Sequence, residues 1–316
     1  MIRNRVKFSG FVLAFVILLW LFSEGQRVRI EQIPQPLYQV YLPMVSRSPD
    51  ARFGTQTGWG ADTCGMTHTL LNMSCGNQHQ LIDDAELVTF GHLEWYIFWN
   101  IVPPHPCLWD GTQSKIVDIV KCAEWVTARP GKVWVIGNEY DCGVQCGGGS
   151  LSATQYAMMY HAATTLIKAN DPTAYLVTSG YASSMCAGWA GTVGAFIAEH
   201  RRLYGEPRPD AWGYHTYQSW KFDEPDSING LNCLIQNLRA AGISPSIYIT
   251  EFGWSGYDTV GDTPENSIAF MRWYIPQLKA IPEVKKALWW EWGAGSQLFI
   301  GDQLTEVGKA YLELAQ

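Results

Sequence analysis

The stretch that decides the fold of this chain reads Val133-Trp134-Val135-Ile136-Gly137-Asn138-Glu139. It is a short run of β-branched and aromatic residues that ends in a polar pair, which predicts a fully buried strand of a parallel sheet. A second stretch, Ile247-Tyr248-Ile249-Thr250-Glu251-Phe252-Gly253, repeats this pattern later in the chain. Barrel enzymes place their reacting groups at the carboxyl ends of such strands. Glu139 and Glu251 are therefore the first candidates for a functional site.

Strand and helix patterns alternate from residue 131 to the C-terminus. Strands are predicted over 132–139, 174–179, 210–217, 246–251 and 286–292, and each is followed by a helical pattern. Ser152 and Gln155 form a predicted capping box, and Pro264 marks the first turn of another helix, which Pro276 should kink or end. Repeated strand–helix units predict a parallel sheet with right-handed crossovers.

The upstream half completes the prediction of a barrel. Strands are predicted over 53–59 and 93–99 and a helix over 112–128, and one further strand is expected near residues 85–90. Residues 51–316 match the roughly 250 residues of a typical barrel. The predicted fold class is thus α/β, a single-domain (β/α)₈ TIM barrel. A doubly wound sheet is the alternative, but no G-x-G-x-x-G turn follows any strand.

The first 50 residues differ from the rest of the chain. Basic residues precede an uncharged apolar run from Phe11 to Phe22, as in a secretory signal. Residues 1–23 are predicted to be either a cleaved signal peptide or an uncleaved membrane anchor through residues 8–22, and the sequence does not choose between them. Residues 24–50 contain several prolines and are predicted to be a tether. The protein is therefore expected to be exported, either secreted or held at the outer face of the cell membrane.

Charge and cysteine content narrow the function classes. The first 50 residues hold six of the 22 basic side chains and three of the 29 acidic ones, so the remainder is more acidic than the whole chain. An acidic domain disfavours a nucleic-acid partner, because phosphate binding requires a basic face. An even number of cysteines in an exported chain predicts disulfides, whose pairing stays open. The eight cysteines stand at positions 64, 75, 107, 122, 142, 146, 186 and 233.

The polar and aromatic residues at the predicted strand ends resemble those of clan A of the glycoside hydrolases, which are retaining TIM-barrel enzymes. The Ile-Gly-Asn-Glu and Ile-Thr-Glu-Phe-Gly-Trp signatures look most like the β-1,3-glucanase-like glycosyl hydrolase catalytic core group. Tyr140 departs from this pattern, in which a proline usually follows Asn-Glu, and no arginine stands at the expected second-strand position. The residues that carry the resemblance are Asn138, Glu139, His215, Tyr217, Glu251, Trp289 and Trp290.

The resemblance implies a role for each matching polar residue. Glu139 would be the acid/base and Glu251 the nucleophile. Asn138 would bind the 2-hydroxyl of the sugar, and His215 or Tyr217 would orient the nucleophile. An ionised Glu251 is expected to raise the pKa of Glu139, since like charges disfavour each other.

Aromatic residues near the strand ends suit a sugar ligand. The resemblance implies that Trp289 or Trp290 forms the floor of a sugar subsite. Trp59 and Trp254 are further predicted substrate-binding residues, because flat sugar faces stack on indole rings and the indole N–H can donate to hydroxyls.

These features favour a retaining hydrolase of a β-linked polysaccharide, with a glucan as the preferred substrate. Two carboxyl groups about 5–5.5 Å apart suffice for this chemistry, so no metal or organic cofactor is required. The protein is expected to be a monomer whose partner is its polysaccharide or oligosaccharide substrate. One alternative is a non-catalytic, surface-anchored carbohydrate-binding barrel, and another is a redox or metal protein built on Cys142-x₃-Cys146.

Overall fold

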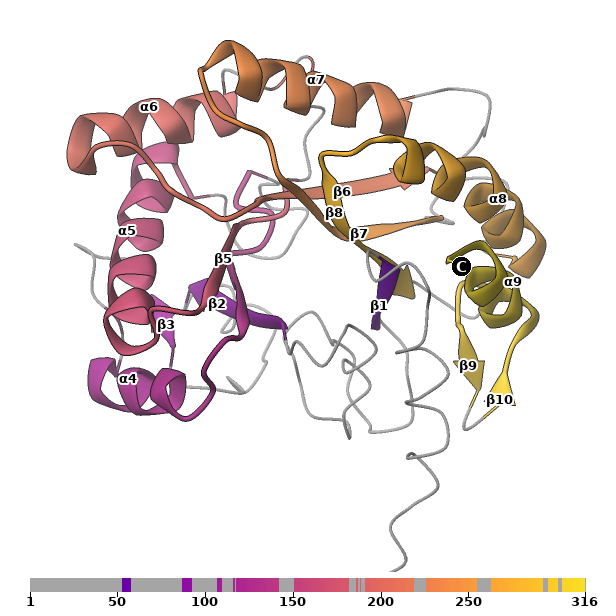
Figure 1. Ribbon diagram of the computed structural model, residues 1–316, viewed down its shortest axis with the longest axis horizontal. Coiled ribbons are helices and arrows are strands. Elements are labelled where there is room, and N and C mark those ends of the chain that lie inside the picture. Colours follow the sequence, from indigo (N-terminus) through magenta and orange to yellow (C-terminus); the bar gives the residue numbers. More distant parts are fainter. Residues whose placement is uncertain are drawn as a thin grey trace, which may run out of the picture. The chain divides into compact units, whose positions relative to one another are not determined.

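The computed structural model describes residues 53–57, 87–92, 107–109, 116, 118–141, 151–181, 186, 188, 191–218, 226–254, 263–291, 295–300 and 303–315. Within these ranges strands and helices alternate along the chain, as the sequence predicts (Figure 1). The strands are β1 (Phe53–Thr57), β2 (Leu87–His92), β3 (Leu108–Trp109), β4 (Val133–Ile136), β5 (Tyr175–Thr178), β6 (Trp212–Gln218), β7 (Ile247–Trp254), β8 (Val284–Glu291), β9 (Phe299–Ile300) and β10 (Gln303–Leu304). The helices are α4 (Ile119–Thr127), α5 (Ala153–Asn170), α6 (Val193–Tyr204), α7 (Asp226–Ala240), α8 (Pro264–Ala280) and α9 (Glu306–Ala315). The predicted signal or anchor and the tether lie outside the described residues.

The main strands form two parallel four-stranded sheets that meet between β5 and β6. The strand orders are β1-β8-β7-β6 and β3-β2-β4-β5. A parallel bridge between Val177 and Ala211 joins β5 to β6, and Thr178 N donates to Ala211 O over 3.1 Å. The short β9 and β10 pair with each other in antiparallel fashion. The fold is therefore an α/β fold of parallel strands, which confirms this part of the predicted fold class.

The strands bury side chains on both faces. One face carries a small cluster that includes Val133, Val135, Val177 and Tyr248. The opposite face carries the large core, in which residues such as Trp134 pack together with the buried faces of the helices. Figure 1 shows α5 to α8 on the outer side of β4 to β8. Burial on both faces explains why the strands read as continuous apolar runs rather than as an alternation.

Local signals in the sequence position the helices. Ser152 forms a reciprocal capping box with Gln155 at the start of α5, and Thr263 caps α8 with Pro264 in its first turn. Gly242 adopts a φ of +79° just after α7, where a left-handed residue is needed to end a helix. The expectation that Pro276 could end its helix was wrong, because α8 continues to Ala280.

Two strands differ in detail from the prediction, and one predicted strand is not tested. The strand expected near residues 85–90 is β2, which runs from Leu87 to His92 and pairs with β4. The strand predicted over 93–99 lies outside the described residues. Strand β7 does not end at Glu251 but continues to Trp254, so Glu251 lies within a paired strand.

Two disulfides are formed among the described cysteines. Cys107 pairs with Cys122, which ties the start of β3 to α4. Cys186, in the segment after β5, pairs with Cys233 on α7. These bonds decide part of the pairing that the sequence left open and agree with the expectation of disulfides in the chain.

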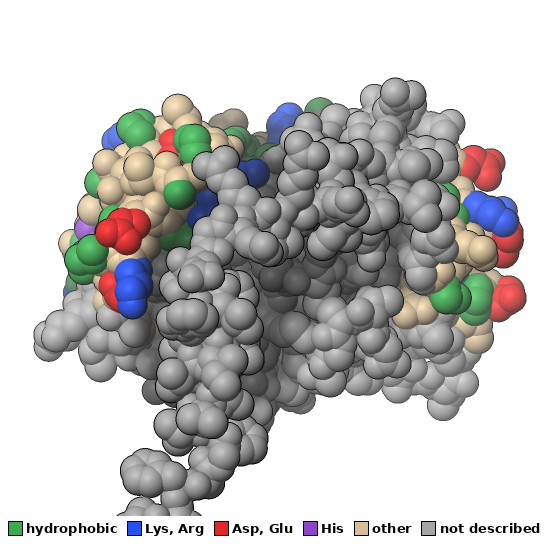
Figure 2. Space-filling model, turned by 90° about the horizontal axis from the view of Figure 1, so that it is seen from below, with side chains coloured by type: hydrophobic (Ala, Val, Ile, Leu, Met, Phe, Trp, Pro, Cys, Tyr) green, Lys and Arg blue, Asp and Glu red, His purple; other side chains and the backbone are tan. Residues whose placement is uncertain are grey.

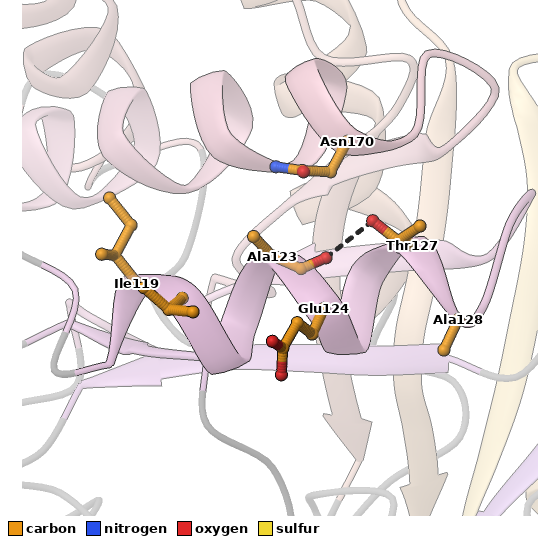
Figure 3. A pocket seen from close by; sticks show the side chains of 7 residues that line it. Ile119, Ala123, Glu124, Thr127, Ala128 and Asn170 are labelled. Atoms are coloured by element: carbon orange, nitrogen blue, oxygen red, sulfur yellow. Dashed lines mark hydrogen bonds between the residues drawn. The ribbon is translucent and has the colours of Figure 1, made fainter.

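The described residues include a surface pocket and side chains of both charges. A pocket of about 640 Å³ lies on the outer face of α4 and reaches Asn170 at the end of α5, and no predicted site residue lines it (Figure 3). On the face seen in Figure 2, described acidic and basic side chains lie near one another. Ion pairs between described residues include Arg202–Glu199 and Lys309–Glu306. Of the helices in the described part of the chain, none combines the length and apolar character needed to cross a membrane.

Candidate active site

Glu139 follows β4 in a strained backbone conformation. The strand ends at Ile136, and Gly137 turns the chain with a φ of +85°. Asn138 is half-buried, and Glu139 itself has a φ of +39°. A left-handed residue with a Cβ costs roughly 1–2 kcal/mol, so the surrounding structure must hold it there. One such contact is the hydrogen bond from Glu139 N to Gly180 O, at 3.0 Å.

His215 on β6 lies between the two predicted catalytic glutamates. Its Nδ1 is 2.7 Å from Glu139 Oε1 and 3.3 Å from Glu251 Oε2. Because both neighbours are carboxylate oxygens, we assign the proton to Nδ1. A Cβ on Gly180 would lie 2.0 Å from His215 Nε2, so only glycine allows the chain after β5 to pass the imidazole ring this closely.

An extra residue in β7 brings Glu251 to His215. Tyr214 pairs with Ile249, but the next residue, His215, pairs with Glu251, so Thr250 is inserted as a β-bulge. In a regular strand Ile249 and Glu251 would share a face, because alternate side chains point the same way. Ile249 belongs to the large core that also includes the helices. The bulge therefore turns Glu251 away from that core and onto the face of His215, as bulges near functional sites do.

Glu251 is buried and only partly satisfied. Tyr217 donates its hydroxyl to Glu251 Oε2, whereas Oε1 is buried without a hydrogen-bond partner in the structure. Burial raises the pKa of Glu251 to about 8; the positive charge of His215 opposes this rise, Glu139 adds to it, and the hydrogen bond from Tyr217 lowers the pKa. The raised pKa of Glu251 was not predicted from the sequence, because it depends on burial in the folded protein.

The two carboxylates also act on His215. Burial of the imidazole would lower the pKa of His215, but the charges of Glu251 and Glu139 outweigh burial and raise it. His215 therefore carries a positive charge more readily than a free histidine. The three facing ligand atoms of Glu139, His215 and Glu251 lie within 4.8 Å of one another, a spacing that could also hold a metal ion.

The predicted tryptophans fall into different places. Trp290 is buried, and Gly253 of the neighbouring strand β7 lies close to both Trp290 and Tyr217. A Cβ built on Gly253 would lie 3.7 Å from Trp290 Cβ and 3.8 Å from Tyr217 Cε1. Trp290 Nε1 has no hydrogen-bond partner in the structure. Trp59 lies outside the described residues.

Trp254 and Trp289 are not brought to the glutamates. Both are fully buried in the large core that includes the helices. Trp289 Nε1 donates to Ser296 O over 2.8 Å, and its ring meets that of Phe252 at right angles. Trp254 packs near Phe270. Trp290 is buried to the same degree, at 1% exposed, so burial does not distinguish it from Trp254 and Trp289.

Two features of the site escaped the sequence analysis. The bulge at Thr250 has no signature in a single sequence, because it depends on pairing with β6 and β8. Gly180 was missed as well, although the Ser179-Gly180 pair directly after a predicted strand is a signal for a close approach of the backbone.

The fold and the site together define a class of protein. Parallel strands surrounded by helices, with two glutamates facing a shared histidine, form the arrangement of an α/β glycoside hydrolase. The chain belongs to the family described as glycosyl hydrolase catalytic core, whose sequence profile matches residues 80–311. This assignment confirms the resemblance found in the sequence. No curated protein matches the chain.

Solved structures share the fold at low sequence identity. A GH128 subgroup II endo-β-1,3-glucanase from Sorangium cellulosum is 14% identical with a TM-score of 0.55, over 83% of this chain and 98% of that chain. A GH128 subgroup I endo-β-1,3-glucanase from Amycolatopsis mediterranei in complex with laminaritriose is 13% identical with a TM-score of 0.53, over 86% and 94%. A GH128 subgroup VII oligosaccharide-binding protein from Trichoderma gamsii is 10% identical with a TM-score of 0.51, over 83% and 94%.

Proposed function

We propose that this protein is a retaining glycoside hydrolase that cleaves a β-1,3-glucan. The observation that carries the proposal is the spacing of Glu139 and Glu251, whose facing oxygens lie within 4.8 Å of each other and of His215 Nδ1. Retaining glycosidases hold their two carboxyl groups about 5–5.5 Å apart, whereas inverting enzymes need a wider gap to admit water. The choice of glucan rests on the structurally similar endo-β-1,3-glucanases, one of them bound to laminaritriose.

In the proposed reaction Glu251 attacks the anomeric carbon while Glu139 protonates the leaving oxygen. Glu251 Oε1 is the oxygen available for attack, because Oε2 faces Tyr217 OH and His215 Nδ1. These two donors oppose the rise that burial causes in the pKa of Glu251, and the proposed reaction requires Glu251 to be ionised and Glu139 to carry the proton when substrate binds. After the glycosyl ester forms, the charge of Glu251 is gone and Glu139 can accept a proton from water.

The remaining predicted features belong to the same proposal. We propose that the two sheets close into a (β/α)₈ barrel and that Asn138 and Trp290 contact the sugar. Residues 51–316 form the catalytic domain in this proposal, and residues 1–50 direct export and supply a signal or anchor and a tether. Secretion and anchoring are distinguished by whether the exported protein retains residues 8–22, which mass spectrometry of that protein determines.

The activity is tested by hydrolysis of laminari-oligosaccharides with the wild-type protein, Glu251→Gln and Glu139→Gln. We expect the wild type to release products whose anomeric configuration, followed by NMR, is initially that of the substrate. Glu251→Gln should lose at least about 10³-fold in kcat while still binding the oligosaccharide, because the nucleophile is gone but the pocket keeps its shape. Inverted products would refute the retaining mechanism.

A non-catalytic sugar-binding role is the second candidate, because the similar protein from Trichoderma gamsii is an oligosaccharide-binding protein. In that case the wild type and Glu251→Gln would bind laminari-oligosaccharides equally and neither would hydrolyse them. Turnover by the wild type that disappears in Glu251→Gln excludes this candidate.

A further inference from the structure

The left-handed backbone of Glu139 needs support from its surroundings. Its own N–H is held by Gly180 O, which belongs to the segment that follows β5. That bond keeps Glu139 in place only if the ends of β4 and β5 stay at a fixed separation. The residue that connects these two ends is Tyr156, in the first turn of α5.

Tyr156 makes two buried hydrogen bonds, one to each strand end. Its hydroxyl donates to Ile136 O over 2.8 Å, at the last residue of β4. The same hydroxyl accepts from Ser179 N over 2.7 Å, directly after β5. The side chain is fully buried, so water does not replace either partner without opening the core. One phenol oxygen thereby sets the distance between the segments that carry Glu139 and Gly180.

Tyr140, the residue that departs from the family pattern, holds the other side of Glu139. Its ring stacks on that of Tyr156 with centroids 4.0 Å apart and an angle of 8° between planes. Its hydroxyl donates to Thr192 O over 2.9 Å, at the start of α6. The chain on both sides of Glu139 is therefore anchored to the same aromatic pair.

The segment after β5 also holds His215, the partner of the Glu139 carboxylate, in place. Gly180 packs against the ring of His215, and His215 N donates to Tyr181 O over 3.2 Å. A shift of the segment after β5 would therefore move His215 as well as the backbone acceptor of Glu139. Both ends of the contact between Glu139 and His215 depend on where Tyr156 holds this segment.

We propose that Tyr156, with Tyr140 stacked on it, is a positioning residue that aims the Glu139 carboxyl at the leaving oxygen of the substrate. This inference rests on the proposed function. It gives Tyr140 a specific role in place of the usual proline: its ring stacks on Tyr156 of α5, and its hydroxyl donates to Thr192 O at the start of α6, a hydrogen bond that a proline side chain cannot make. Tyr156 itself touches neither reacting carboxyl in the described contacts.

A misplaced Glu139 should change kcat/KM differently for two leaving groups, whereas a loss of stability should change both values alike. A misplaced acid slows cleavage when the leaving group needs a proton, and has little effect when the leaving group departs unprotonated. We therefore compare kcat/KM for 4-methylphenyl and 2,4-dinitrophenyl β-laminaribiosides. For Tyr156→Phe we expect a roughly 10- to 100-fold loss on the first substrate and less than about threefold on the second.

Tyr160→Phe is the matched control. Tyr160 lies one turn further along α5 and is fully buried, and its hydroxyl has no hydrogen-bond partner among the described residues. Its removal should leave the ratio of the two kcat/KM values at the wild-type level. Tyr140→Phe, which keeps the stacked ring and loses the bond to Thr192, should change the ratio by a smaller factor than Tyr156→Phe. It also serves as the test variant if Tyr156→Phe does not fold.

A second measurement does not depend on activity. NMR titration of ¹⁵N-labelled histidine follows His215, whose Nδ1 contacts Glu139. In Tyr156→Phe the pKa of His215 should fall below its wild-type value, because the carboxylate moves away, and in Tyr160→Phe it should not. An unchanged substrate ratio together with an unchanged titration of His215 would overturn the inference. A wild type that hydrolyses neither glycoside would instead refute the proposed function, and the titration alone would then decide the positioning role.

Discussion

Glu251 is a carboxyl group that the folded protein holds away from water. Its side chain is 5% exposed, and one of its oxygens has no hydrogen-bond partner in the structure. A catalytic nucleophile needs such a site, because a carboxylate that is weakly solvated by water is ready to attack. The same burial makes the ionised form costly, so the residue that the proposed reaction requires should reduce the stability of the fold.

Replacing Glu251 by glutamine should therefore stabilise the protein in a pH-dependent manner. The folded-state pKa of Glu251 is raised to about 8 from an ordinary value near 4.5. The neutral carboxyl of Glu251 thus contributes its full stabilisation below about pH 4.5. This contribution is lost as the pH rises through 8, where Glu251 ionises in the folded protein. Glutamine does not ionise, so the stability of Glu251→Gln relative to wild type should rise between pH 5 and pH 9, by up to about 4 kcal/mol. Thermal unfolding at both pH values measures this.

The control for this experiment is Glu313→Gln, on an exposed position of α9. It should change the melting temperature little and by the same amount at pH 5 and pH 9. An equal effect of Glu251→Gln at the two pH values would contradict the raised pKa.

At the scale of secondary-structure elements, the site is assembled by irregularities at strand ends. The bulge in β7 turns Glu251 towards His215, and the turn after β4 brings Glu139 to the same ring nitrogen, Nδ1. The segment after β5 is cross-linked to α7 by Cys186–Cys233, which spans 47 residues, and Cys107–Cys122 spans 15. The segment that contains Gly180 is thus linked covalently to α7 through Cys186.

The two disulfides should contribute unequally to stability. In the chain-entropy account, closing a loop of this longer span stabilises by about 4 kcal/mol and closing the shorter one by about 3 kcal/mol. We expect Cys186→Ser/Cys233→Ser to lower the free energy of unfolding more than Cys107→Ser/Cys122→Ser, measured by urea titration. A larger loss in the short-loop variant would show that local packing, and not loop closure, determines their contributions.

At the scale of the whole molecule, the site spans the seam between the two sheets, which is the boundary where Val177 and Thr178 of β5 meet Ala211 beside β6. Glu139 follows β4 in one sheet, whereas His215 and Glu251 lie on β6 and β7 in the other. The seam is tight at Gly213, whose N–H donates to Thr178 Oγ1 over 2.9 Å. A Cβ on Gly213 would lie 2.4 Å from the backbone oxygen of Thr178, which cannot rotate away as a side chain could.

Gly213→Ala should therefore separate β5 from β6. We expect a loss of about 2–3 kcal/mol in the free energy of unfolding, typical of an overpacked core, together with a fall in kcat as His215 moves away from Glu139. Gly191→Ala is the matched control, because a Cβ at Gly191 meets nothing within 4 Å. Unchanged stability and kcat in Gly213→Ala would show that the seam can widen without disturbing the site.

Much of the element order was predictable because its signals are local. Ser152 and Gln155 are three residues apart, and their reciprocal hydrogen bonds define the start of α5 wherever the helix packs. The apolar run of β4 and the polar residues after it likewise follow from neighbouring residues. Of the two outcomes predicted for Pro276, a kink or an end of the helix, the end does not occur, because α8 continues past it to Ala280.

The sequence by itself determined the alternation of strands and helices, the helix caps and the two glutamates near strand ends. Only the tertiary structure decided that Glu251 faces His215, that Gly180 lets the backbone pass that ring, and that Tyr156 joins β4 to β5. The physical reason is the range of the interactions: a capping box closes over three residues, whereas His215 meets Glu139 across 76. Contacts of that range depend on strand register and close packing, which no single segment specifies.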